Sequence, residues 1–116
     1  MLIYICYPKC TTCQKAQKWL DDHGVAYTLR HIKEDKPSYE ELKTWYVTSE
    51  KPLRKFFNTS GLLYKSLALK DRLPAMTEEE MLRLLATDGM LVKRPLLIGE
   101  DFVLVGFKEA EWQAKI

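Results

Sequence analysis

The feature that most constrains the fold is a pair of cysteines placed directly after an apolar segment. Residues 2–6 read LIYIC, a β-branched and aromatic run typical of a buried strand. A short loop follows, and residues 13–20 carry an apolar stripe at helical spacing. The order strand, loop, helix therefore places Cys10 and Cys13, spaced as C-x-x-C, at the first turn of a helix.

Local signals predict where this helix and the next strand begin and end. Thr11 and Gln14 have capping-box spacing, which predicts a helix that begins at Thr11. Gly24 suits the end of that helix. Alternating apolar residues over 25–32 predict a second strand. The chain therefore opens as β-α-β.

The middle of the chain reads as helical. Capping boxes at Ser38 and Thr77 each precede an apolar helical pattern, and Pro52 suits the start of a short helix through Phe57. Residues 33–37 and 70–74 are predicted to be loops. We expect this helical insertion to span about residues 38–87.

The end of the chain returns to strands. Residues 96–98 and 102–105 predict a hairpin with a turn at 99–101, and residues 107–114 predict a closing helix. The order β-α-β, helices, β-β-α predicts an α/β, thioredoxin-like fold. We expect a mixed four-stranded sheet and a single domain over residues 1–116, consistent with the length.

Composition narrows the function classes. The 18 basic and 16 acidic residues leave a net charge of +2, which predicts neither direct nucleic-acid binding nor membrane binding. Apolar runs reach about five residues, against the roughly 20 that span a bilayer. No signal peptide is visible before the first strand, and the odd number of cysteines, all in one stretch, argues against a secreted disulfide scaffold. We expect a cytoplasmic protein, and a monomer.

Cysteine at a helix N-terminus has a specific chemistry. Unpaired N–H groups and neighbouring cations lower the pKa of cysteines in such positions from about 8.5 to roughly 3.5–7.5. Cys10 is therefore the predicted nucleophile, and Cys13 the thiol that resolves a mixed disulfide. Substrate contacts are predicted for the residues beside Cys10, namely Lys9, Thr11 and Thr12.

Three other interpretations of the cysteines are weaker. Cys10 and Cys13 could be small apolar core residues, which is also our interpretation of Cys6. With Cys6 the spacing becomes C-x3-C-x2-C, as in radical-SAM iron–sulfur proteins, but 116 residues cannot supply the large barrel that such chemistry needs. A zinc site would need His23 or His31, and neither has regular ligand spacing. We therefore expect no metal.

The pair Arg94-Pro95 precedes the third predicted strand. In thioredoxin-like folds the proline at this place is cis and lies against the cysteine pair, where its backbone meets a partner. Arg94 would then bring a guanidinium toward the Cys10 thiolate or a bound oxyanion. The alternative is a solvated arginine before a turn proline. Arg54, in the helical insertion, is by default a surface residue.

Three segments together resemble the arsenate reductase-like (ArsC/Spx) family. They are residues 7–16 with the Trp19-Leu20 and Gly24 that follow, the FFNTSG stretch at 56–61, and the DGMLVKRP stretch at 88–95. The resemblance covers nearly the whole chain and implies a thioredoxin fold with a helical insertion.

The resemblance implies two kinds of activity. In the family's arsenate reductases a cysteine attacks arsenate, arginines hold the oxyanion, and glutathione with glutaredoxin completes the cycle. Cys10, Arg94 and Arg54 match those positions, with Pro95 beside them. In the Spx branch the C-x-x-C is a redox switch on a regulator that binds RNA polymerase.

This chain departs from both branches. No arginine follows Arg94, Cys13 adds a second cysteine that the glutaredoxin-coupled reductases usually lack, and Gln14 replaces an arginine of many relatives. The chain ends soon after Trp112, whereas Spx regulators are longer. We therefore predict a thiol-disulfide redox protein that uses a thiol partner such as glutathione, glutaredoxin or thioredoxin and holds no resident cofactor. An RNA-polymerase-binding regulator and an arsenate reductase are the alternatives.

Overall fold

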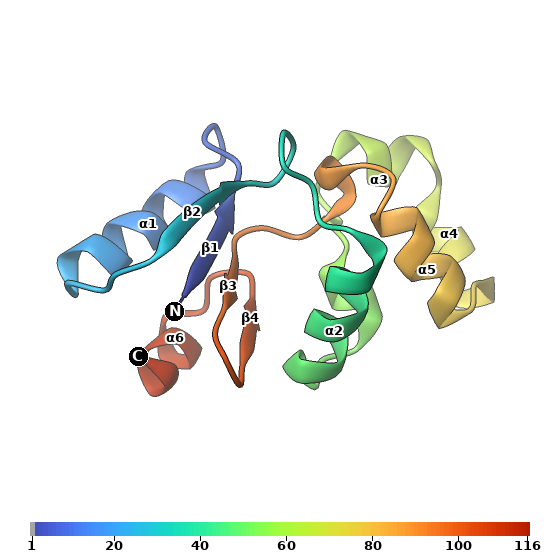
Figure 1. Ribbon diagram of the computed structural model, residues 1–116. Helices are drawn as coiled ribbons and strands as arrows, with labels where there is room; N and C mark the ends of the chain where they lie inside the picture. Colours follow the sequence, from blue (N-terminus) through green and yellow to red (C-terminus); the bar gives the residue numbers. More distant parts are fainter. Residues whose placement is uncertain (1) are drawn as a thin grey trace.

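Four short strands form one mixed sheet in the order β2-β1-β3-β4 (Figure 1). The computed structural model describes residues 2–116. β1 runs parallel to β2 and antiparallel to β3, and β3 forms a hairpin with β4. The strands are β1 (Ile3–Cys6), β2 (Thr28–His31), β3 (Leu96–Ile98) and β4 (Val103–Val105). The mixed four-stranded sheet predicted from the sequence is confirmed.

The helices divide into two groups by position in the chain. Those at the two ends are α1 (Thr11–Asp22) and α6 (Glu109–Lys115). The others all lie between β2 and β3: α2 (Tyr39–Ser49), α3 (Leu62–Ser66), α4 (Leu69–Arg72), α5 (Glu78–Leu85) and the 3₁₀ turns η1 (Leu53–Phe56), η2 (Leu73–Ala75) and η3 (Gly89–Leu91). The segment between the second and third strands is therefore helical, as predicted.

The two faces of the sheet support two separate hydrophobic cores. Because side chains alternate along a strand, Tyr4 and Cys6 of β1 face one way and Ile5 faces the other. The first core, the thiol-side core, packs these strand residues against α1 and α6. The second, the insertion-side core, packs the opposite face against helices that include α2 and α5. The sheet thus separates the cysteine helix from the helical insertion.

Side-chain capping explains where α2 and α5 begin. Both the Ser38 and the Thr77 capping boxes form, with the hydroxyl accepting from the third helical N–H and the glutamate accepting from the cap N–H. The predicted box at Thr11 is wrong, although α1 does begin there. Cys10 occupies the cap position, and the Gln14 side chain instead donates to the Pro8 carbonyl at 2.9 Å. Gly24 follows α1 with φ +65°, as its predicted role requires.

Two boundaries differ from the sequence prediction. Residues 70–74 form α4 and η2 rather than a loop, because Ala68 adopts a left-handed conformation (φ 52°) that ends α3 and starts a new turn. The second strand is limited to Thr28–His31, where it pairs with β1.

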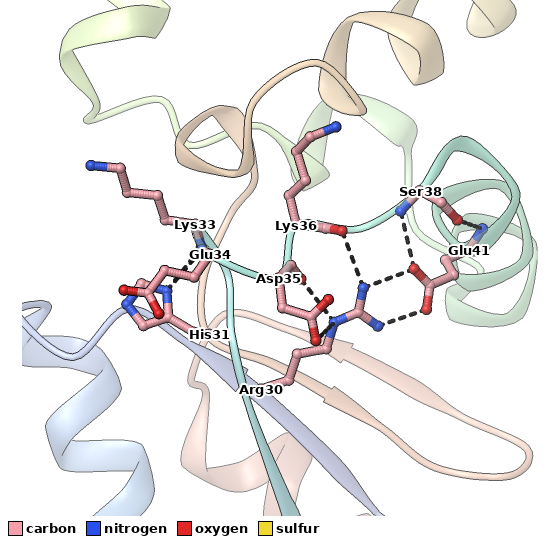
Figure 2. A network of polar contacts seen from close by, with 8 residues as sticks. All are labelled: Arg30, His31, Lys33, Glu34, Asp35, Lys36, Ser38 and Glu41. Carbon is pink, nitrogen blue, oxygen red and sulfur yellow. Dashed lines mark hydrogen bonds and ion pairs between the residues drawn. The ribbon is translucent and has the colours of Figure 1, made fainter.

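An arginine joins β2 to α2 (Figure 2). The Arg30 guanidinium donates to both Glu41 oxygens at 2.6 and 2.8 Å and to the backbone carbonyls of Asp35 and Lys36. The same carboxylate accepts from the Ser38 N–H at 3.0 Å, so one glutamate closes the capping box and anchors the helix to the strand. The hydrogen bonds from Arg30 lower the pKa of Glu41 to about 2.

The closing helix is fixed by a tryptophan. Trp112 is fully buried, and its indole N–H donates to the Gly106 carbonyl at 3.0 Å. Its ring meets the rings of Tyr4 and Phe107 edge to face, with centroids 6.2 and 4.9 Å apart. α6 is therefore an integral part of the thiol-side core. Within residues 2–116 no helix is long and apolar enough to cross a bilayer.

Candidate functional site

Cys10 is the residue immediately before α1. Its backbone is extended (φ −86°, ψ 122°), its carbonyl accepts the first helical bond from Gln14 N–H at 3.0 Å, and its own N–H donates to the Tyr7 carbonyl at 2.9 Å. No side chain caps the helix at this position, so the first-turn N–H groups have no competing side-chain acceptor there. Cys10 is half-buried, so its sulfur lies at the positive end of α1 within reach of solvent.

Cys13 lies one turn further along and is buried, with 1% of its surface exposed. Its Sγ accepts from the Tyr7 N–H at 3.4 Å, and the Tyr4 hydroxyl donates to its carbonyl. The hydrogen bond with the Cys6 thiol and burial raise the pKa of Cys13 well above its usual range. Cys13 is therefore a neutral thiol at physiological pH. Within residues 2–116 all three cysteines are free thiols, and Cys6 is a core residue, as predicted.

Tyr7 connects the cysteine motif to Arg94. Its backbone contacts both Cys10 and Cys13, while its ring lies under the Arg94 guanidinium, 5.1 Å from Cζ to the ring centre. The His31 ring meets the same ring edge to face at 5.8 Å. No motif rule predicts this role; the available signal is an aromatic residue between the strand and the cysteine loop.

Arg94 and Pro95 are joined by a cis peptide bond, as expected for this place in the fold. Pro95 is buried, and its carbonyl accepts from the Gly106 N–H at 2.8 Å. The half-buried Arg94 side chain lies between the Tyr7 ring and Met90, whose sulfur is 3.9 Å from Nη1. No carboxylate pairs with Arg94 in the described part of the chain, so its charge remains available to an anion at the thiol loop.

Three further predicted residues surround Cys10. Lys9, Thr11 and Thr12 are all exposed, on the loop and the first turn of α1. Lys9 also lines a cavity of about 260 Å³, whose other walls include Tyr7 and His31. A ligand in this cavity would meet a cation and aromatic side chains, although no cysteine lines it.

Arg54 does not line the cavity that contains Lys9. It is exposed on η1 and lines a cavity of about 240 Å³ together with Lys93 and Lys108. Among residues 2–116 no hydrogen bond or ion pair joins Arg54 to Cys10 or Arg94. The structure therefore brings Cys10, Cys13 and Arg94 together through Tyr7, with Lys9 nearby, and puts Arg54 in a different cavity.

Metal ligation has no arrangement to support it in the described residues. Within 2–116, no group of three or more His, Cys, Asp or Glu side chains is placed to hold a metal ion. His31 uses Nδ1 to accept from the N–H groups of Lys33 and Glu34, at 3.1 and 3.2 Å, which fixes it as a loop-ordering residue. The chemistry that the site offers is that of thiols beside a cation.

Known proteins share both the sequence and the fold. A protein from Bacteroides fragilis, described as related to the ArsC family, superposes with a TM-score of 0.96 at 56% identity, over 97% of this chain and 95% of its own. The uncharacterized protein YusI of Bacillus subtilis is 53% identical over 97% of this chain and 95% of its length. The global transcriptional regulator Spx of Enterococcus faecalis is 31% identical over 96% of this chain and 83% of its length.

The sequence pattern of the ArsC family matches residues 5–115 of this chain. The match is therefore not confined to the cysteine motif but includes the sheet, the helical insertion and the closing helix. With a thioredoxin-like sheet, a C-x-x-C at the start of α1 and a cis proline before β3, the chain belongs to the ArsC family.

Proposed function

We propose that this protein is a thiol-disulfide redox protein in which Cys10 is the nucleophile and Cys13 the resolving thiol. The observation that carries the proposal is the difference in burial between the two cysteines along α1. Cys10 is half-buried at the N-terminus of α1, and Cys13 is buried one turn below it. Disulfide exchange needs an accessible nucleophilic cysteine with a buried second thiol one helical turn away.

The reaction proceeds in two exchanges. The Cys10 thiolate attacks one sulfur of a substrate disulfide, so that a Cys10–substrate mixed disulfide forms and the other substrate sulfur leaves as a thiolate. Cys13 then loses its proton and attacks the Cys10 sulfur, forming the Cys10–Cys13 disulfide and releasing the second substrate thiolate. The substrate gains two electrons and the cysteine pair loses two. A dithiol donor, or two molecules of glutathione, restores both thiols.

Neighbouring residues assist without taking part in the bond changes. The Arg94 guanidinium, held over the Tyr7 ring, offers a positive charge to an anionic partner, and the Tyr7 N–H stabilises the thiolate that forms on Cys13. Lys9 favours donors with carboxylates, and Thr11 and Thr12 offer hydroxyls to the bound partner. Glutathione, glutaredoxin and thioredoxin are the donors we propose, in a reducing cytoplasm.

The test separates the two cysteines. With a peptide disulfide as substrate, Cys10→Ser should abolish exchange, whereas Cys13→Ser should accumulate a mixed disulfide on Cys10 that mass spectrometry detects. Cys6→Ala is the control and should still release substrate, because the Cys6 sulfur forms no bond in either exchange. If Cys10→Ser retains exchange, or if Cys10 reacts with iodoacetamide no faster than an ordinary thiol near neutral pH, the proposal is wrong.

A redox-sensing regulator is the second candidate. It is favoured by the alignment of 96% of this chain with a transcriptional regulator of the Spx branch. In this role the Cys10–Cys13 bond would change a protein-binding surface, with RNA polymerase as the partner to examine. Pull-downs with the oxidised protein and with a Cys10→Ser/Cys13→Ser variant discriminate the roles. A polymerase subunit recovered with only one form supports regulation, and identical recoveries argue against it.

A further inference from the structure

The helical insertion contains a cavity that the cysteines do not reach. Its volume is about 450 Å³, within the range of small-molecule sites, which is roughly 300–1,000 Å³. Its walls come from η1, α3, α4, η2 and α5. Apolar residues and cations share the lining, chiefly Leu73, Pro74, Met81, Arg54, Lys55 and Lys70.

The cations of this cavity have no counter-charge. No carboxylate lines it, and within residues 2–116 no ion pair involves Arg54, Lys55 or Lys70. General basicity does not account for this cluster, because the net charge of the whole chain is only +2. Three cations facing one concavity repel each other, and a bound anion would remove that repulsion.

The adjoining cavity extends the same positive surface. It shares Arg54, Lys55 and Thr59 with the first cavity and adds Lys93 and Lys108. Its single carboxylate, Glu111, is already paired with Lys51 at 3.2 Å. The two cavities therefore form one continuous cationic surface that meets at Arg54 and Lys55.

Hydrogen bonds between separate segments fix the backbone that carries the lining residues. Asn58 N–H donates to the Leu91 carbonyl at 2.8 Å and Lys93 N–H to the Phe56 carbonyl at 2.7 Å, which secures the shared wall. On the opposite side, the left-handed Ala68 turns the chain between α3 and α4. Leu73 is 7% exposed, and Met81 packs against the insertion-side core. The backbone segments that carry the lining side chains are therefore held in place relative to one another.

We propose that this cavity binds a small organic anion, with an apolar body against Leu73, Pro74 and Met81 and an acid group held by Arg54, Lys55 and Lys70. The Arg54 fork suits a carboxylate, phosphate or sulfonate, and the lysines add point charges. The site uses none of the cysteines and is a function additional to disulfide exchange.

The test is an NMR titration of the full chain at constant ionic strength. Naphthalene-1-sulfonate is the probe, and 1-naphthalenemethanol, which has the same ring and no charge, is its neutral counterpart. We expect saturable shifts at the amides of Thr59, Lys70 and Met81, and affinity about tenfold weaker for the neutral compound. Linear shifts without saturation, shifts centred elsewhere, or equal affinity for the two compounds would overturn the proposal.

Variants with altered charge provide a second test of the proposal. Lys70→Glu should weaken naphthalene-1-sulfonate binding by about tenfold, whereas Lys43→Glu, an equal charge change at an exposed site on α2, should alter it by less than about twofold. Should Lys70→Glu fail to fold, Lys70→Met removes the charge alone. Equal affinity in the Lys70 variant and in the Lys43 control contradicts the proposal. Cys10 alkylation is measured in parallel and should not change in Lys70→Glu, so failure of the thiol chemistry and failure of this site are distinguishable.

Discussion

The guanidinium of Arg94 lies over the ring of Tyr7, with 5.1 Å between Cζ and the ring centre. The backbone of Tyr7 simultaneously accepts from Cys10 and donates to Cys13. One residue therefore positions both cysteines and the cation that accompanies them, although Arg94 is far away in the sequence. Tyr7 therefore acts on the site through two separate routes, its backbone and its ring.

Replacing the ring separates these routes. Tyr7→Leu leaves both backbone hydrogen bonds in place but removes the cation–π contact, worth about 0.5–1 kcal/mol or more. Arg94 should then lose its fixed position, and the rate of Cys10 alkylation by iodoacetamide near neutral pH should fall by about threefold. Tyr7→Phe keeps the ring and is the control. Equal rates in the Leu and Phe variants would show that the ring does not position Arg94.

The resolving step should depend steeply on pH. The raised pKa of Cys13 leaves it protonated at neutral pH, so each unit rise in pH increases its thiolate population about tenfold. Release of the substrate from the mixed disulfide should accelerate by about tenfold per pH unit, or about a hundredfold between pH 6 and 8. Rapid-quench mass spectrometry measures this rate. A release rate independent of pH would mean that proton loss from Cys13 does not limit the step.

Acid should weaken the link between β2 and α2. Glu41 has a pKa of about 2 in the folded protein, below the value of about 4.3 for an unfolded chain. Its contribution is therefore complete above about pH 4.5 and is lost as the pH falls toward 2. Because the Glu41 side chain is 37% exposed, we expect Glu41→Gln to lower the free energy of unfolding at pH 7 by only about 1–2 kcal/mol.

Urea denaturation at a series of pH values checks this. The difference between the wild type and Glu41→Gln should shrink toward zero as the pH falls to 2 and below, where the wild-type carboxyl becomes protonated. Glu40→Gln, an exposed change in the same helical turn, should cost less than about 0.5 kcal/mol at every pH. A constant difference for Glu41→Gln over the whole series would contradict the linkage.

A glycine should stabilise the turn between α3 and α4. Ala68 holds φ 52°, a left-handed conformation that costs a residue with a Cβ roughly 1–2 kcal/mol. Ala68→Gly relieves this cost and should raise the free energy of unfolding by about 0.5–1 kcal/mol, after the entropy that glycine loses. Ala110→Gly, in the exposed part of α6, should lower it by about as much. Thermal and urea unfolding compare the pair, and a loss of stability in Ala68→Gly would refute the strain argument.

Arsenate should be a poor substrate. A desolvated oxyanion needs several paired cations, and the described residues place Arg94 beside the thiol loop while Arg54 lines a different cavity. With glutathione and glutaredoxin present, we expect arsenite production near the rate without protein. Rapid production that Cys10→Ser abolishes would reverse this conclusion and make arsenate reduction the primary activity.

Much of the fold was predictable because its signals are local. The Ser38 and Thr77 capping boxes and the Gly24 helix end depend on residues within one turn of each other, and all three form as predicted. The strands flanking the cysteine motif are recognisable for the same reason. The position of Cys10 at the start of α1 follows from these elements alone.

The remainder depends on contacts between distant residues. Cys10 itself takes the cap position, and the Gln14 side chain donates to the Pro8 carbonyl. Capping-box spacing does not reveal this arrangement. α3 and α4 are too short for a clear helical period, and they are separated by the left-handed Ala68. The pairing of Arg94 with Tyr7 and the separation of Arg54 from them arise only when the insertion packs.

The division of the hydrophobic interior by the sheet has an evolutionary consequence. The core that holds the thiols and the core formed by the insertion are separate clusters of buried residues on opposite faces of four short strands, so a substitution inside one core leaves the packing of the other largely intact. Selection can therefore reshape what the insertion recognises while the sulfur chemistry is preserved. Proteins with this fold can therefore acquire new binding partners while they keep the same cysteine site.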